Sequence, residues 1–206
     1  RMFALCIAAN AFLAAPASGI LCNTKAPVRA VTPKANLLDN FLGGMQKGFG
    51  EPVVMGTEEM MSQKAHGTSA VPAQKNLRWN CDYETADRIC NFNRHYAEYG
   101  GYWERATTFL EEEDGKEPIN FYDTNTGKLL FKYDTKVRSW DDFVKESKVH
   151  GWPSFRDEEV NWDYVRVLPN GECISVDGTH LGHNLPDLSG NRYCINLVSV
   201  AGQPLD

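Results

Sequence analysis

The chain has 206 residues, of which 42% are hydrophobic and 23% charged, and its net charge is −6 at pH 7. This composition is ordinary for a folded domain with a buried core, and without a basic patch it argues against a nucleic-acid partner. The six cysteines have no regular spacing, so they do not form the disulfide framework of a small secreted domain.

The first 38 residues differ in charge from the rest of the chain, because they contain four basic residues and no acidic one. Residues 2–21 are uncharged and rich in alanine, and small residues at 15–19 are typical of a signal-peptidase site. A signal peptide followed by a basic, transit-like stretch predicts targeting to a plastid (chloroplast) through the secretory route. The alternative is a membrane span, since about 20 uncharged residues can cross a bilayer. Its polar and helix-breaking residues disfavour that alternative.

Residues 39–76 are predicted to be a linker, because glycines and prolines recur along them. Residues 77–114 are predicted to be a helical extension. Its first helix is capped by Asp82 or Thr85 and carries an apolar stripe at three- and four-residue steps. The stripe comprises Ile89, Phe92, Tyr96, Tyr99 and Trp103. Two glycines at 100–101 are expected to interrupt it before a second helix, and the stripe indicates packing against the following domain.

From residue 115 onward the pattern changes to short apolar runs separated by turn residues. Strands are predicted at residues 119–122, 128–133, 164–168, 172–176 and 193–200. One helix is expected between them, capped by Ser139 and continuing to Val149. Residues 115–206 are therefore predicted to form a small, mainly antiparallel β domain.

Three blocks of sequence carry side chains suited to chemistry. They are His-Gly-Trp-Pro-Ser-Phe at 150–155, His-Leu-Gly-His at 180–183 and Arg-Tyr-Cys-Ile-Asn at 192–196. Cys194 follows Arg192 by two residues, and a nearby cation favours the thiolate, which is the reactive form of cysteine. A lone cysteine in a strand is more often a small buried hydrophobe, so the prediction depends on the three blocks together.

In this order the three blocks resemble the B-type methionine sulfoxide reductases, which reduce the R epimer of methionine sulfoxide. The resemblance covers about residues 119–202, and residues 127–131 give a weaker fourth match. It implies a mainly β fold of two antiparallel sheets, preceded here by N-terminal helices and an irregular N-terminal extension. It also implies oxidised proteins as substrates, an external thiol reductant such as thioredoxin, and no bound cofactor.

The resemblance also implies the catalytic roles. Cys194 takes the place of the nucleophile, Arg192 stabilises its thiolate, and Asn196 orients the neighbourhood. His180 and His183 take the places of the imidazoles that handle the proton and position the sulfoxide oxygen, a task that suits a group titrating near neutral pH.

The same resemblance implies a substrate wall. Trp152 would hold the methyl group of the substrate, and Pro153 and Phe155 would shape the wall around it. Taken singly, each of these residues also suits a structural role in the core, in a turn or in a surface ion pair. Their joint occurrence in the order of the family favours the catalytic interpretation.

The chain departs from the family pattern at two places. Many members hold a structural zinc with two Cys-x-x-Cys pairs, and the corresponding positions here are Asp123, Thr126, Ile174 and Asp177. No thiolate remains among them, so we predict no zinc. His150 stands where the family usually has its resolving cysteine. Cys173 is the possible internal replacement, with a buried structural side chain as the slightly favoured alternative.

Three hypotheses follow for the function. The first is a zinc-free, plastid methionine-R-sulfoxide reductase that acts in protein repair under oxidative stress. The second is a non-catalytic subunit of a larger assembly, with the thylakoid membrane as its candidate location, that reuses the reductase fold. The third and weakest is a redox sensor that switches through Cys194 and Cys173.

Overall fold

The structure is a computed structural model that describes residues 49–205. The predicted targeting segment, residues 1–38, and the first part of the predicted linker lie outside the described residues. Among the helices of residues 49–205, none is long and apolar enough to cross a membrane.

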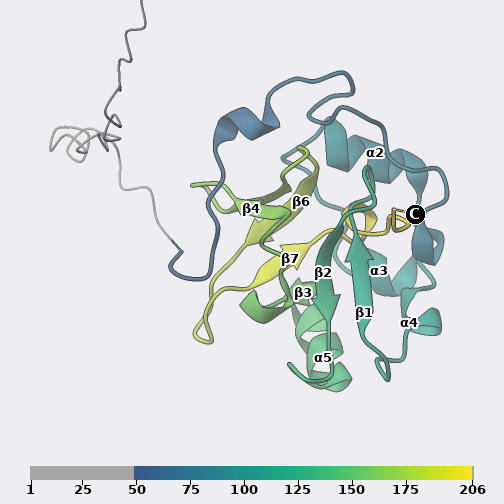
Figure 1. Cartoon of the computed structure of the whole chain (residues 1–206). Coiled ribbons are helices and arrows are strands. Elements are labelled where there is room, and N and C mark those ends of the chain that lie inside the picture. The colour runs from purple at the N-terminus through teal and green to yellow at the C-terminus, as the bar shows by residue number, and fades with distance from the viewer. Residues whose placement is uncertain (1–48, 206) are drawn as a thin grey trace, which may run out of the picture. The chain divides into compact units, whose positions relative to one another are not determined.

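Two antiparallel sheets build the domain (Figure 1). The smaller is a hairpin of β1 (Ile119–Tyr122) and β2 (Leu129–Tyr133). The larger has the strand order β3-β7-β6-β5-β4. Its strands are β3 (Ser154–Phe155), β4 (Val165–Val167), β5 (Glu172–Ser175), β6 (His180–Asn184) and β7 (Tyr193–Ile195). The predicted fold class, mainly β with two antiparallel sheets, is confirmed.

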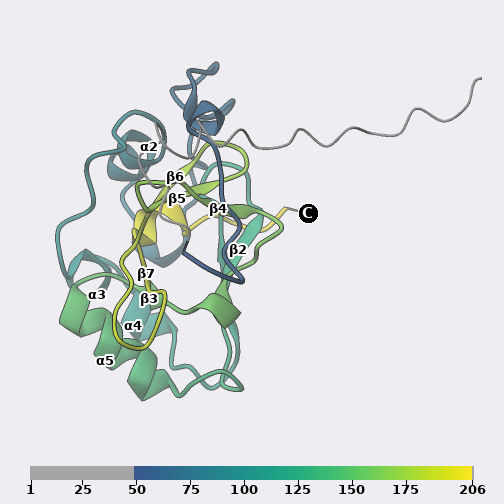
Figure 2. The same ribbon diagram turned by 90° about the vertical axis from the view of Figure 1, so that its left-hand side faces the viewer.

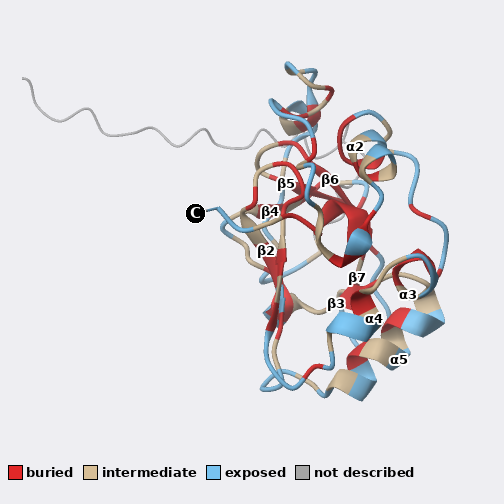
Figure 3. Cartoon of the chain, turned by 90° about the vertical axis from the view of Figure 1, so that its right-hand side faces the viewer, coloured by how far each residue is buried: buried red, intermediate tan, exposed pale blue. Residues whose placement is uncertain are grey.

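An aromatic core joins the hairpin to the larger sheet. Phe155 of β3 lies 4.6 Å from Phe131 of β2 and 4.9 Å from Phe121 of β1, between ring centroids. Phe143 of helix α5 (Trp140–His150) packs against the same ring at 5.6 Å. All four rings are fully buried, and each contributes about 1.5–3 kcal/mol through burial. Figure 3 shows buried residues along the strands and exposed residues on the outer sides of the helices.

Helix α5 (Trp140–His150) forms where the sequence predicts it. Oγ of Ser139 caps it by accepting a hydrogen bond from the backbone N–H of Asp142 at 3.2 Å. The helix ends at Gly151, whose φ of 88° lies in the left-handed region that favours glycine. This termination turns the chain directly into Trp152. Figure 2 shows α5 at the same end of the domain as α3 (Tyr102–Arg105) and α4 (Phe109–Glu112).

Helix α2 (Tyr83–Asn91) begins as predicted, with Asp82 accepting a hydrogen bond from the backbone N–H of Thr85 at 2.8 Å. The prediction that its apolar stripe continues through Tyr99 is wrong, because the helix ends at Asn91. Three stripe residues are more than half exposed: Phe92, Tyr96 and Tyr99. The chain leaves the helix there and runs to the larger sheet, where Arg94 contacts Glu172 of β5.

Two short helices, α3 (Tyr102–Arg105) and α4 (Phe109–Glu112), stand in place of the single second helix that was predicted. The predicted strand over residues 193–200 is also too long. β7 ends at Ile195, and residues Leu197–Ser199 form a 3-10 helix. The histidine segment is itself a strand, β6, which the sequence pattern did not predict.

The described part of the predicted linker, residues 49–76, packs against the larger sheet. The backbone N–H of Gly56 donates to the carbonyl of Val167 at 2.9 Å, which adds this segment to the edge strand β4. A 3-10 helix at Glu58–Met61 follows, and Met61 is buried against Leu168 and Ile174. The segment also delivers Glu58 to the neighbourhood of Arg94.

Candidate active site

Four polar side chains form a row across the larger sheet because of its strand register. Ser154 of β3 pairs with Cys194 of β7. Cys194 in turn pairs with His183 of β6, and His183 pairs with Glu172 of β5. Directly paired residues of antiparallel strands point to the same face of the sheet. The predicted nucleophile is therefore flanked by a hydroxyl on one neighbouring strand and an imidazole on the other.

The Cys194 sulfur is partly exposed and has two polar neighbours. Nη1 of Arg192 donates to it at 2.5 Å, and Oγ of Ser154 lies 3.8 Å away. Burial raises the pKa of the Cys194 thiol, and Arg192 and Ser154 offset only part of that rise. The free protein therefore holds a thiol at neutral pH. The cation favours the thiolate, as predicted from the sequence, but burial has the larger effect on this pKa.

Arg192 is held beside the sulfur by its own contacts. Nε of Arg192 lies 3.4 Å from Oδ2 of Asp187, and the same oxygen accepts a hydrogen bond from Nη2 of Arg156 at 2.9 Å. The backbone N–H of Arg192 donates to Oδ1 of Asn184 at 3.2 Å. These contacts fix the guanidinium, so that it can compensate negative charge as it forms on the sulfur.

His180 is buried and paired with a carboxylate. Its Nδ1 lies 2.8 Å from Oε1 of Glu172, which also accepts hydrogen bonds from Arg94, the shortest at 2.6 Å. Burial alone would raise the pKa of Glu172, but the hydrogen bonds from His180 and Arg94 outweigh it and lower this pKa to about 2. The ionised carboxylate keeps a proton on Nδ1 of His180, and Nε2 is the nitrogen left for proton transfer.

His183 lies next to His180, with 5.8 Å between the two ring centroids. Burial, followed by the charge of His180, lowers the pKa of His183. The ring is therefore neutral at neutral pH and offers one N–H donor and one acceptor nitrogen. Such a ring is suited to hold a polar oxygen without carrying charge.

Glu98 ties Trp152 and Asn196 together. Nε1 of Trp152 donates to the backbone carbonyl of Glu98 at 3.0 Å, and the backbone N–H of Glu98 donates to Oδ1 of Asn196 at 3.1 Å. The buried Glu98 carboxylate accepts from the N–H groups of Leu197 and Val198 at 2.9 and 3.1 Å. This carboxylate explains why β7 ends at Ile195, since those N–H groups are taken out of the sheet ladder.

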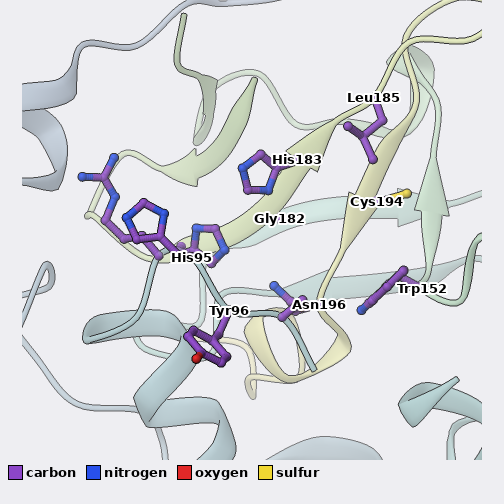
Figure 4. A pocket seen from close by; sticks show the side chains of 11 residues that line it. His95, Tyr96, Trp152, Gly182, His183, Leu185, Cys194 and Asn196 are labelled. Carbon is purple, nitrogen blue, oxygen red and sulfur yellow. The ribbon is translucent and has the colours of Figure 1, made fainter. Parts of the chain in front are cut away.

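The side chains line one pocket of about 200 Å³. Its lining includes Cys194, His180, His183, Asn196 and Trp152, together with His95 and Tyr96 from the segment after α2. Figure 4 shows Cys194 and Trp152 on one side of the pocket, and His95 and His183 on the other. Pockets for drug-sized ligands span about 300–1,000 Å³, so this one matches a single side chain better than a nucleotide-sized cofactor.

Two predicted wall residues lie elsewhere. Phe155 is fully buried in the aromatic core, stacked on Phe131, and does not line the pocket. Pro153 is also absent from the lining, and its carbonyl accepts a hydrogen bond from the backbone N–H of Ile195 at 3.0 Å. That both shape the substrate wall stays a prediction. Phe155 lies in β3, the strand beside β7, and pairs there with Tyr193.

Cys173 faces away from Cys194. It pairs with Gly182 of β6, which pairs with Ile195 of β7, so these residues share the face opposite to the polar row. Cys173 is fully buried in the core, and this burial raises the pKa of its thiol. The register therefore argues against the predicted role of Cys173 as a resolving cysteine.

Polar side chains occupy three of the four positions that correspond to the zinc cysteines of the family, and the fourth is the buried Ile174. Asp123 is buried and accepts a hydrogen bond from Oγ1 of Thr179 at 2.9 Å. Nζ of Lys128 lies 2.7 Å from Oδ2 of Asp177, to which Thr126 also donates at 3.4 Å. In the part of the chain that the structure describes, no group of three or more His, Cys, Asp or Glu side chains could hold a metal ion.

Sequence reasoning did not identify Arg94, Glu98 or Glu172 as site residues. A signal exists for Glu172, because it is a carboxylate in an otherwise apolar predicted strand and buried carboxylates need partners. Arg94 and Glu98 have no such local signal. The partners of the Arg94 guanidinium and the Glu98 carboxyl group in the larger sheet and after β7 lie 78 or more residues further along the chain.

Comparisons with known proteins show similarity to one family. A peptide methionine sulfoxide reductase MsrB from Methanosarcina mazei is 36% identical over 85 residues, covering 36% of this chain and 54% of the relative. An MsrB from Leifsonia xyli is 38% identical over 69 residues, covering 27% of this chain and 48% of the relative. The chain thus spans about half the length of these curated relatives. No family model matches it, and no solved structure matches it significantly.

Proposed function

We propose that the domain reduces methionine-R-sulfoxide residues of oxidised proteins to methionine. The observation that carries the proposal is the Cys194 thiol, 2.5 Å from Nη1 of Arg192, in a pocket shared with His180, His183 and Trp152. The similarity to two methionine sulfoxide reductases supports the same chemistry. The preference for the R epimer rests on the resemblance of the three sequence blocks.

The proposed reaction transfers one oxygen atom between two sulfur atoms. The S–O bond of the sulfoxide breaks and an S–O bond forms on Cys194, so methionine is the reduced product and the Cys194 sulfenic acid the oxidised one. Nε2 of His180 takes the thiol proton and returns it to the transferred oxygen. Arg192 compensates the charge of the thiolate while it exists, which burial otherwise disfavours.

Different residues of the pocket would contact different groups of the substrate. Trp152 presents an indole, anchored through its N–H to Glu98, and an aromatic surface is a favourable seat for an S-methyl group. His183 is neutral and can donate a hydrogen bond to the sulfoxide oxygen. A methyl seat on one side and an oxygen partner on the other would distinguish the two epimers of the sulfoxide.

Regeneration of the thiol requires an external reductant in this proposal. Two thiols of a thioredoxin-like donor reduce the sulfenic acid, which yields the Cys194 thiol, a disulfide on the donor and one water molecule. The other cysteines of residues 49–205 are buried, and Cys173 faces the opposite side of the sheet. The same placement weighs against the redox-sensor hypothesis.

The proposal is tested by assaying each epimer of a peptide methionine sulfoxide with dithiothreitol as reductant. Cys194→Ser is expected to abolish reduction of the R epimer. Cys173→Ala is the matched control and should retain activity, since it removes a thiol of the same sheet that faces the core. Reduction that survives Cys194→Ser, or a preference for the S epimer, would refute the proposal.

We further propose a plastid location on the composition of residues 1–38. Import of a fluorescent fusion carrying this segment into isolated plastids is the test, and exclusion of the fusion would contradict it. A non-catalytic role in a larger assembly is the alternative function. Co-migration of the native protein with a large complex, together with an inactive pocket, would favour that alternative.

A further inference from the structure

An arginine from outside the three sequence blocks reaches the polar row of the sheet. Arg94 lies in the segment between α2 and α3, and its side chain is 23% exposed. Its Nη2 lies 2.6 Å from Oε2 of Glu172, whose side chain is only 4% exposed, and its Nε donates to both carboxylate oxygens at 3.1 and 3.2 Å. Glu172 in turn contacts Nδ1 of His180 at 2.8 Å. Arg94, Glu172 and His180 form one continuous chain of side-chain contacts, and Arg94 and His180 both line the pocket.

We propose that Arg94 and Glu172 are positioning residues that together set the proton affinity and the ring orientation of His180, with Arg94 opposing the effect of Glu172. The catalytic consequence of this arrangement rests on the function proposed above. The effect of Arg94 and Glu172 on His180 does not depend on that function, because the contacts are a property of the folded protein.

The two residues act in opposite directions by simple electrostatics. A carboxylate at hydrogen-bond distance favours the protonated imidazole and fixes the proton on Nδ1. Arg94 places a positive charge beside the same carboxylate and partly cancels the electrostatic effect of that carboxylate on His180. A proton carrier must both accept and release its proton, and an unopposed buried carboxylate would hold that proton too firmly.

Other titratable groups lie near His180 in the described part of the chain. His183 follows on the same strand, and its ring centroid lies 5.8 Å away. His95, from the segment after α2, and Cys194 of β7 line the same pocket. Glu58 contacts Arg94 from the far side and is 67% exposed. Glu58 touches the guanidinium but not the imidazole, which makes it the natural control.

The test compares the pH dependence of R-sulfoxide reduction in three variants of the full chain. In the proposed mechanism Cys194 and His180 share one proton, so the acid limb of kcat/KM follows His180. Arg94→Met should move that limb to higher pH and Glu172→Gln should move it to lower pH, each by about one unit. Glu58→Gln removes the exposed partner of Arg94 alone and should leave the limb in place.

A spectroscopic measurement separates this inference from the proposed function. The 15N shifts of the His180 ring, assigned by comparison with His180→Gln, give its titration midpoint in each variant without any assay of activity. Folded Arg94→Met and Glu172→Gln proteins are expected to shift that midpoint in opposite directions, and Arg94→Lys should restore part of it. Shifts in the same direction, or none in either folded variant, would overturn the inference even if sulfoxide reduction is confirmed.

Discussion

At the scale of single residues, the reactivity of Cys194 is a balance between burial and one cation. The sequence identifies the cation, because Arg192 and Cys194 are two positions apart in a strand and project from one face. It does not identify the burial, which comes from segments far away along the chain. Burial dominates, so the pKa of the thiol is raised rather than lowered. A reactive thiolate therefore forms only when a base accepts the thiol proton.

This balance predicts how alkylation of Cys194 depends on pH. Its rate with iodoacetamide should rise with a midpoint above the usual thiol pKa, and Arg192→Met should raise that midpoint further by about one unit, since removal of a cation disfavours the thiolate. Arg192→Lys should lie between the two. Peptide mass spectrometry of Cys194 gives the rates, and a midpoint near pH 7 in the native protein would contradict the account.

At the scale of elements, local sequence signals place the start of a helix well and its end poorly. The caps Ser139 and Asp82 predict the first turns of α5 and α2. An N-cap needs only one side-chain oxygen and the backbone N–H three residues later, so the local sequence is enough to predict it. Neither cap indicates that α2 ends at Asn91. The end of β7 depends on Glu98, whose partners at Leu197 and Val198 are about a hundred residues away.

Glu98 also predicts a dependence of stability on pH. Burial raises the pKa of this carboxyl to about 8 in the folded protein. The unfolded value is about 4.3, so the folded state binds more protons between these values. The contribution of Glu98 to the free energy of unfolding is therefore complete at low pH and is lost as the pH rises through about 8. Glu98→Gln should flatten this part of a thermal-denaturation series taken across pH.

Glu98→Ala gives the structural counterpart. It leaves two buried N–H groups without partners, which costs at least about 2 kcal/mol of unfolding free energy. Urea denaturation measures the loss. Equal stability of Glu98→Ala and the native protein would show that these N–H groups find water instead.

At the scale of the whole molecule, the pocket is lined by segments that lie far apart in the described chain. The three sequence blocks predict that Cys194, His180 and His183 belong to one site, because the motifs and their order can be read from the local sequence. The segment after α2 completes the pocket through Arg94, His95 and Tyr96, and it bears no motif. The row across the sheet was also not predictable, since it requires the register and a strand, β6, that the pattern did not indicate.

The family's zinc positions give a prediction at this scale. Lys128 and Asp177 join the β1-β2 turn to the β5-β6 turn by a partly buried ion pair. A chelator should therefore change neither the melting temperature nor the activity. Lys128→Met should lower the unfolding free energy by about 1 kcal/mol. A fall in melting temperature after treatment with EDTA would contradict the metal-free account.

The most direct test of the central claim is the mass of Cys194 after a single turnover without reductant. The account predicts that the R epimer yields one equivalent of methionine and adds one oxygen atom to Cys194, which dimedone then traps as a sulfenic acid. Methionine formed while Cys194 remains unmodified, or no methionine at all from folded protein, would contradict it.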